Sequence, residues 1–178
     1  MGGKAGTFIG GASGGGNLPD SPLKDRPEGT IAFVVFALAG ETYAVEIGKV
    51  REIIRVPKIT WVTGAPDFVR GVINLRGSVV AVLDMAHILF SSPISESPEA
   101  RIIIVESGGV TVGMLVEGVT RVADIEPSHL EPALRTLDES QRLCVVAQSS
   151  VDNELIGILD LEKVMERARV VISPREGT

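Results

Sequence analysis

Apolar residues occur along this chain in short runs that glycine, proline and aspartate interrupt. Residues 42–47 alternate, which would place Tyr43, Val45 and Ile47 on one face of a strand. Arg76-Gly77 separates two further runs in the manner of a hairpin turn. The other runs that we interpret as strands are 32–38, 50–56, 71–75 and 78–83. Many short strands at close spacing predict small β-barrels or a sandwich.

The pattern is repeated within the chain. At a shift of 69 positions, six residues fall on six others, and the pairs are Gly40 and Gly109, Tyr43 and Val112, Val45 and Met114, Ile47 and Val116, Val50 and Val119, and Ile53 and Val122. At a shift of 76 positions, Leu83-Asp84 with Ile88-Leu89 match Leu159-Asp160 with Val164-Met165. We therefore expect two related β units, at about residues 30–90 and 100–168.

A short helix is expected after each Leu-Asp pair. Asp84 and Asp160 are suited to be N-caps, because an aspartate side chain accepts hydrogen bonds from the N–H groups of the first helical turn. Apolar residues from Leu161 to Ala168 recur at helical spacing, which predicts an amphipathic helix near the C-terminus. Residues 1–29 are rich in glycine and proline and are interpreted as a flexible tail, and residues 169–178 as a C-terminal tail.

Composition and charge narrow the class of protein. The formal net charge is −6 and no cluster of lysine or arginine is present, which argues against nucleic acid as a partner. The longest apolar runs are too short to span a membrane. A single cysteine, Cys144, fits a reducing compartment. We expect a cytoplasmic protein that does not insert into the membrane.

Residues with catalytic or metal-binding chemistry are few. His87, His129 and Cys144 do not occur at zinc-ligand spacing. No serine stands in a G-x-S-x-G motif, and glycine pairs such as Gly108-Gly109 lie between apparent strands, where they favour hairpin turns. The sequence therefore predicts a protein that is not an enzyme and that uses no metal and no cofactor.

Three polar residues stand inside apolar runs, and they are Glu52, Asn74 and Arg76. One interpretation is that they occupy the solvent face of alternating strands. The other is that Glu52 pairs with Arg76 across neighbouring strands and orients the guanidinium at a binding surface. An exposed pair would add only about 0.2–1 kcal/mol to stability, so its value would be in positioning.

These segments carry a resemblance to a known family. Three segments in order resemble the signature of CheW, the chemotaxis coupling protein family. They are Ile47-x-x-Val50-x-Glu52-Ile53, then Gly-Val-Ile-Asn-Leu-Arg-Gly at residues 71–77, and later Leu83-Asp84. The stretch 113–122 resembles it too, and the match runs from about residue 30 to residue 166. The four residues Asn-Leu-Arg-Gly alone would be a weak signal, whereas the ordered series is specific.

The resemblance implies an all-β fold of two SH3-like five-stranded β-barrels packed side by side. It implies a non-catalytic scaffold that couples the cytoplasmic tip of methyl-accepting chemoreceptors to the regulatory domain of a CheA-type histidine kinase. Such a protein would be monomeric alone and would assemble with its partners into arrays at the membrane. The implied receptor-binding residues are Ile47, Val50, Glu52, Gly71, Asn74, Leu75, Arg76 and Gly77. The implied kinase-binding residues, expected around the second barrel, are Ile102, Gly113 and Val119.

The chain departs from the family pattern at a few positions. Ala81 stands where proline is frequent, Met85-Ala86 where Leu-Arg is common, Glu131 where a basic residue is frequent, and Val146-Ala147 where a glycine-containing strand is usual. An alternative function is a small-molecule or peptide-binding β-barrel outside chemotaxis. Its mark would be a deep apolar pocket ringed by aromatic residues, and aromatic residues make up only 4% of this chain.

Overall fold

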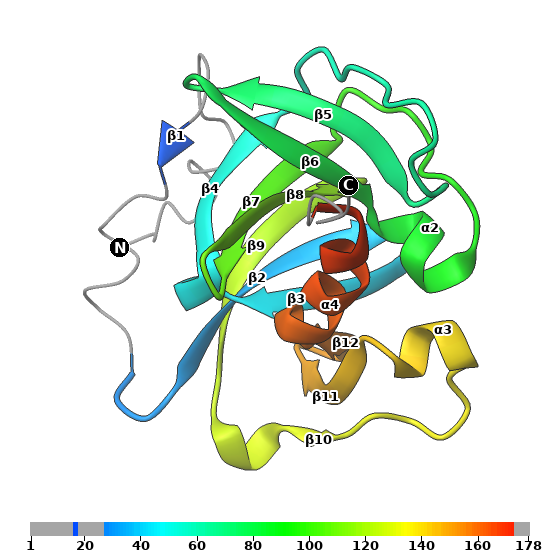
Figure 1. Ribbon diagram of the computed structural model, residues 1–178. Helices are drawn as coiled ribbons and strands as arrows, with labels where there is room; N and C mark the ends of the chain where they lie inside the picture. Colours follow the sequence, from blue (N-terminus) through cyan, green and yellow to red (C-terminus); the bar gives the residue numbers. More distant parts are fainter. Residues whose placement is uncertain (1–15, 18–26, 173–178) are drawn as a thin grey trace.

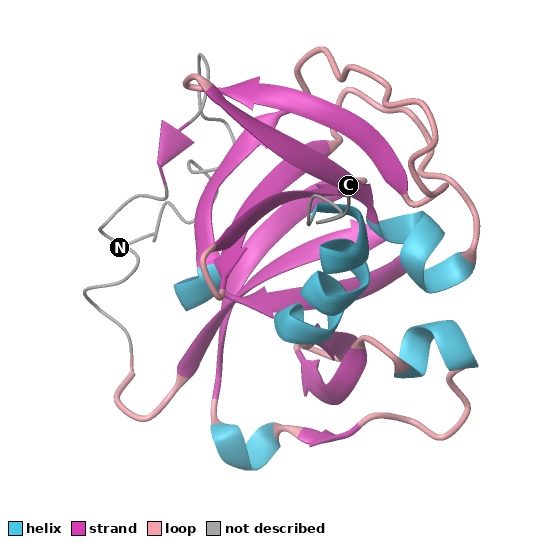
Figure 2. Cartoon of the chain, viewed as in Figure 1, coloured by secondary structure: helices cyan, strands magenta, loops and turns pink. Residues whose placement is uncertain are grey.

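A computed structural model describes residues 16–17 and 27–172 of the chain. Strands dominate it, and the helices are short (Figure 2). The strands are β1 (Gly16–Asn17), β2 (Ile31–Leu38), β3 (Glu41–Glu46), β4 (Val50–Arg55), β5 (Val69–Leu75), β6 (Ser78–Asp84), β7 (Arg101–Ser107), β8 (Val110–Val116), β9 (Gly118–Ile125), β10 (Glu131–Pro132), β11 (Val145–Val151) and β12 (Glu154–Leu159). The helices are α2 (Met85–Phe90), α3 (Glu139–Arg142) and α4 (Leu161–Ile172), with 3-10 turns η1 (Ile47–Lys49) and η2 (Pro127–His129).

The strands form two curved sheets, which we call the first and the second barrel (Figure 1). The first has the strand order β1-β4-β7-β8-β6-β5, and the second has the order β10-β11-β12-β3-β2-β9. In each sheet, five strands are accompanied by a two-residue strand at one end, β1 or β10. The predicted all-β fold, with two barrels of five main strands side by side, is confirmed.

Each barrel takes strands from both halves of the chain. The first combines β4, β5 and β6 with the hairpin of β7 and β8, and the second combines the hairpin of β2 and β3 with β9 to β12. Strands from different halves meet in two parallel pairings, β6 with β8 and β3 with β12, and in two antiparallel pairings, β4 with β7 and β2 with β9. The halves therefore exchange their first hairpins.

Backbone irregularities follow the sequence repeat. The β5–β6 turn has positive φ at Arg76 and Gly77, and the β11–β12 turn has it at Asp152 and Asn153, 76 positions later. Two successive residues with positive φ give the hairpin turn whose twist matches that of the flanking strands. Bulges also recur, because the pairing shifts between Val69 and Gly71 in β5 and at the matching place in β11.

Strand β2 shows how the barrels share a core. Phe33 and Val35 belong to a small apolar cluster inside the second barrel. Val34, Phe36 and Leu38, on the opposite face of β2, belong to a larger cluster that also includes residues of β5 to β8, α2 and α4. Because both faces of β2 are buried, the strand reads as a continuous apolar run rather than an alternating one.

Both predicted helix caps are present. The Asp84 carboxylate accepts a hydrogen bond from the N–H of His87 at 3.1 Å, and that of Asp160 accepts from the N–H of Glu162 at 2.9 Å. Helix α4 continues to Ile172, so residues 169–172, expected in the C-terminal tail, are helical instead. Of the predicted N-terminal tail, Gly16–Asn17 forms β1, while residues 1–15 and 18–26 lie outside the described residues.

Candidate functional site

A groove opens at one end of the first barrel, between β4, the β5–β6 hairpin and the β7–β8 hairpin. We call it the first groove, and its volume is about 700 Å³. Its lining combines charged and apolar residues, which are Arg51, Glu52, Leu75, Arg76, Ser78, Val79, Val80, Ile104, Glu106, Gly109, Val110 and Thr111. Because β7 and β8 come from the second half of the chain, the groove depends on the exchanged hairpin.

Glu52 and Arg76 form a bidentate ion pair in this groove, in agreement with the second of the two interpretations that the sequence left open. Arg76 Nη1 donates to Glu52 Oε1 at 3.0 Å, and Nη2 donates to Oε2 at 2.7 Å. The side chain of Glu52 is 3% exposed, whereas that of Arg76 is 64% exposed. A buried carboxylate thus holds a guanidinium that faces the solvent, and two parallel bonds fix its plane.

Local backbone geometry places both side chains. The pairing of β4 with β7 contains a bulge between Val50 and Glu52, and a bulge re-aims the side chains beside it. Arg76 occupies the β5–β6 turn with a φ of 51°. The Asn74 side-chain oxygen accepts a hydrogen bond from the N–H of Gly77 at 2.9 Å, which closes this turn.

Further charged and apolar side chains surround the pair. Arg51 forms an ion pair with Glu106 of β7, the strand that pairs with β4. Leu75 is half-buried, and Val79, which lines the same groove, is 73% exposed although it is a large apolar residue. The groove therefore offers a fixed cation beside apolar contact area, a composition suited to a protein partner.

Residues 32–169 match the family model of the CheW-like domain. The chain belongs to the CheW family. Among its relatives, the chemotaxis protein CheW of Klebsiella aerogenes is 26% identical over 140 residues, which cover 79% of this chain and 84% of that protein. The CheW protein of Thermotoga maritima is 30% identical over 135 residues, which cover 76% of this chain and 87% of that protein.

Two further comparisons add to the family assignment. The protein FrzA of Myxococcus xanthus is 28% identical over 156 residues, covering 85% of this chain and 95% of FrzA. The crystal structure of the scaffolding protein TtCheW from Thermoanaerobacter tengcongensis matches with a TM-score of 0.67 and 32% identity, covering 74% of this chain and 89% of TtCheW. This likeness confirms that the two barrels are the SH3-like barrels of CheW proteins.

The CheW signature residues predicted to contact a receptor separate into two groups. Glu52, Leu75 and Arg76 line the first groove, and Asn74 and Gly77 are exposed in the turn beside it. The structure thus brings together five of the eight residues.

The other three have different positions. Ile47 and Val50 are half-buried where η1 connects β3 of the second barrel to β4 of the first. Gly71 is buried at the β5 bulge with a φ of 143°, and a Cβ atom there would stand 2.2 Å from the carbonyl oxygen of Thr60. Close backbone packing accounts for this glycine.

The residues predicted to contact a kinase are buried. Ile102 and Gly113 lie in β7 and β8, which pair with β4 and β6, so they belong to the first barrel and not to the second as expected. A Cβ atom on Gly113 would be 2.6 Å from a methyl group of Ile102. Val119, at the start of β9, is buried in the second barrel. All three therefore pack inside the strands that carry them.

Sequence reasoning did not identify several groove residues, above all Arg51, Glu106 and Val79. Glu106 reaches the groove only because β7 pairs with β4, a long-range pairing that strand periodicity does not report. For Val79 a signal was present, because the sequence predicted a strand over residues 78–83, in which neighbouring side chains point to opposite faces.

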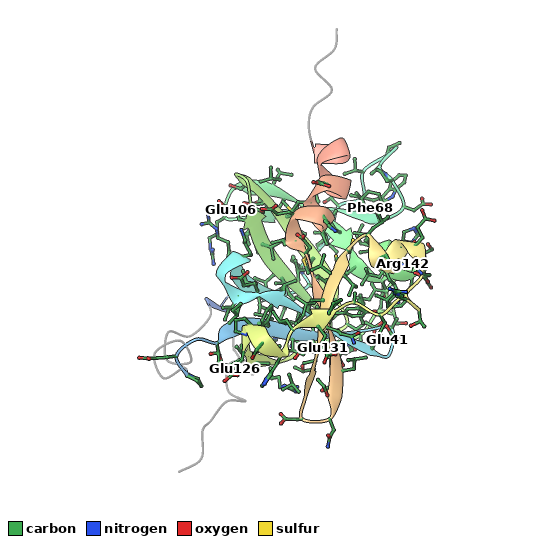
Figure 3. All side chains as sticks on the ribbon, turned by 90° about the horizontal axis from the view of Figure 1, so that it is seen from below. Glu41, Phe68, Glu106, Glu126, Glu131 and Arg142 are labelled. Atoms are coloured by element: carbon green, nitrogen blue, oxygen red, sulfur yellow. The ribbon has the colours of Figure 1, made fainter. Side chains whose placement is uncertain are left out.

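A second groove occupies the corresponding end of the second barrel. Its lining includes Gly40, Glu41 and Thr42 and the β12 residues Glu154 and Leu155, which correspond in the repeat to first-groove residues. Inside it, the Tyr43 hydroxyl donates to Glu41 at 2.5 Å, and burial together with this carboxylate raises the pKa of Tyr43 well above its ordinary value. Glu41 and Glu106, one from each groove, are labelled on opposite sides of the molecule in Figure 3.

The described part of the chain lacks two features. It holds no group of three or more histidine, cysteine, aspartate or glutamate side chains placed to bind a metal ion. No helix within residues 27–172 is long and apolar enough to cross a membrane.

Proposed function

We propose that this protein is a non-catalytic adaptor that couples the cytoplasmic tip of a chemoreceptor to the regulatory domain of a CheA-type histidine kinase. Family membership supports the coupling role, and several relatives are named chemotaxis proteins. The observation that carries the site is the guanidinium of Arg76, held in place by the buried Glu52 at the edge of an exposed groove.

The groove suits a receptor contact for physical reasons. A guanidinium that is already fixed by two hydrogen bonds loses little conformational entropy when a partner binds. Leu75 and Val79 supply apolar area next to it. A cation flanked by apolar side chains is the usual composition of the residues that dominate protein–protein affinity.

The kinase contact is proposed to use the exposed residues of β9 together with the partly exposed ends of β7 and β8, since the middles of β7 and β8 are buried. The buried residues Ile102, Gly113 and Val119 support these strands from within. Two separate contact faces let one copy bind two partners, and repeated weak contacts then build an array. We propose the cytoplasmic face of such receptor arrays as the location, with a monomer before assembly.

The alternative function, a small-molecule or peptide-binding barrel, is not favoured. Its expected mark is an enclosed apolar pocket ringed by aromatic residues. None of the described residues that line the first groove is aromatic, and four of them carry a charge.

The test is the affinity of Arg76→Ala for a purified receptor tip. We expect the dissociation constant to rise about tenfold, because alanine removes a central contact. Stability should fall by no more than about 1 kcal/mol, because Arg76 is mostly exposed and Glu52 regains water when it is removed. Arg55→Ala, at an exposed arginine outside the groove lining, is the matched control and should bind normally.

Two results would contradict this assignment. A melting temperature many degrees lower in Arg76→Ala would show that the arginine is structural. Unchanged receptor affinity in both Arg76→Ala and Val79→Asp would place the receptor elsewhere, since Val79 is exposed and its substitution should not disturb folding.

A further inference from the structure

The outer edge of β4 is covered by a segment of the chain itself. β4 pairs with β7 on one side, and on the other it pairs antiparallel with β1, with Gly16 opposite Ile53 and Asn17 opposite Glu52 (Figure 1). β4 has six residues and β1 has two, so β1 covers part of this edge. An end strand with free N–H and C=O groups is a template for an added strand.

The register places this added strand at the candidate site. Asn17 pairs with the residue whose carboxylate fixes Arg76. A strand held at Glu52 therefore stands next to the first groove. A partner that reached Arg76 from the side of β4 would meet this segment first.

The energetics of so short a strand favour a reversible contact. The net gain from a backbone hydrogen bond is no larger than the entropic cost of ordering the residue that makes it, so a strand of two residues is close to balance. Glycine loses more backbone freedom than any other residue, which weakens the pairing of Gly16 further. Residues 18–30 connect β1 to β2, so the segment remains tethered near β4 at an effective concentration on the order of millimolar.

The second barrel lacks the same arrangement among its described residues. The repeat equates β4 with β9, yet the short strand of the second barrel, β10, pairs with β11 at the opposite end of the sheet. The covered edge is thus a property of the first barrel, where the candidate receptor groove lies.

We propose that the outer edge of β4 is a strand-addition site, that residues 16–17 are its resident strand, and that this strand competes with the partner of the Glu52–Arg76 surface. The edge pairing stands independently of function. The competition between residues 16–17 and a partner rests on the proposed function. It makes residues 16–17 an internal inhibitor that the partner displaces.

The test uses the full chain with two substitutions of opposite effect. Asn17→Pro removes an N–H donor and disfavours strand pairing, whereas Gly16→Val favours extended backbone. Gly11→Pro, outside β1, is the control. Hydrogen exchange of the β4 amides reports the edge pairing, and the affinity for a purified receptor tip reports the competition.

In Asn17→Pro, we expect hydrogen exchange of the outward β4 amides to accelerate about threefold or more. We also expect the receptor tip to bind about threefold to tenfold more tightly, because the β4 edge is free of residues 16–17 in a larger fraction of the molecules. Gly16→Val should slow the exchange of these amides and weaken the binding of the receptor tip. Unchanged exchange in both variants would overturn the strand-addition site. Changed exchange with constant affinity would overturn the competition. If no variant bound the receptor tip, the proposed function and the competition would fail together, and exchange alone would decide the edge pairing.

Discussion

The ends of the two barrels carry ion pairs of opposite arrangement. In the first barrel, Arg76 is exposed and is gripped by a buried Glu52 through two hydrogen bonds. In the second, Arg121 takes the place that the repeat assigns to Glu52, and it pairs with Glu154 at 3.5 Å. There the carboxylate is the more exposed partner, at 45% against 31% for the arginine.

This difference between the two barrels separates the features that the fold requires from those that it does not. Bulges, hairpin turns and helix caps recur in both barrels, because they set the backbone path. The charged side chains at the barrel ends do not recur, so their identity is free to serve binding. Opposite charge order at equivalent ends suits different partners. Three paired substitutions and one single substitution test how far the two barrels differ, and they follow from the largest expected effect to the smallest.

Gly71→Ala should destabilise the protein most. The new Cβ would stand 2.2 Å from the Thr60 carbonyl oxygen, at a φ of 143° that an alanine rarely adopts. Strain and overlap together should lower the free energy of unfolding by about 3 kcal/mol or more. The repeat places Ala147 at the equivalent position, and Ala147→Gly should lower it by only about 0.5–1 kcal/mol. Urea denaturation of both variants measures the two values, and similar losses would contradict the asymmetry.

Asp84→Ala should destabilise more than Asp160→Ala. Asp84 is buried and also accepts a hydrogen bond from the N–H of Ile94 at 3.0 Å, which ties the segment after α2 to the helix start. Its removal leaves buried donors without a partner, and we expect a loss of about 2–3 kcal/mol. Asp160 is half-buried and acts as a helix cap, so its loss should be about 1 kcal/mol. Equal melting temperatures in the two variants would refute this order.

Glu52→Gln and Glu154→Gln compare the two ion pairs directly. Because Glu52 is buried and binds the guanidinium through both oxygens, we expect Glu52→Gln to reduce stability by about 1 kcal/mol. Glu154 is half-exposed, so its change should remain below about 0.5 kcal/mol. Adding 0.5 M salt during thermal unfolding should weaken the Glu154 pair more. A larger loss of stability in Glu154→Gln than in Glu52→Gln would contradict this order.

Ser149→Ala should be mildly stabilising. Ser149 is 1% exposed, and its hydroxyl has no hydrogen-bond partner among the described residues. The repeat equates it with Ile73, a core residue of the first barrel. Removing an unpaired buried hydroxyl should raise the free energy of unfolding by up to about 1 kcal/mol. Calorimetry that showed a clear loss would mean that the hydroxyl is satisfied.

The sequence predicted local features well. The hairpin at Arg76-Gly77 and the caps at Asp84 and Asp160 depend on residues that are close in the chain, and all three were confirmed. The ion pair of Glu52 with Arg76 was one of two interpretations drawn from their positions among apolar neighbours, and it is present in the structure.

Long-range pairing explains what the sequence did not predict. Strand periodicity is the same whichever strand lies alongside, so it could not reveal that β7 and β8 join the first barrel. The resemblance had implied that Ile102 and Gly113 lie around the second barrel, and they are buried in the first instead. The pairing of Gly16–Asn17 with β4 escaped notice for a related reason, because glycine-rich composition indicates flexibility and says nothing of an open strand edge.

The exchange of hairpins has a consequence for synthesis on the ribosome. When residues up to Phe90 have emerged, β4, β5 and β6 still lack β7 and β8, and β2 and β3 lack every other strand of their sheet. Neither barrel can close while only the first half of the chain has emerged. The second barrel cannot close until β12 has emerged and can pair with β3. Folding is therefore delayed until almost the whole chain is available, and non-local pairing of this kind is slow. The unpaired strand edges of this first half are therefore the part of the protein most prone to aggregation during synthesis.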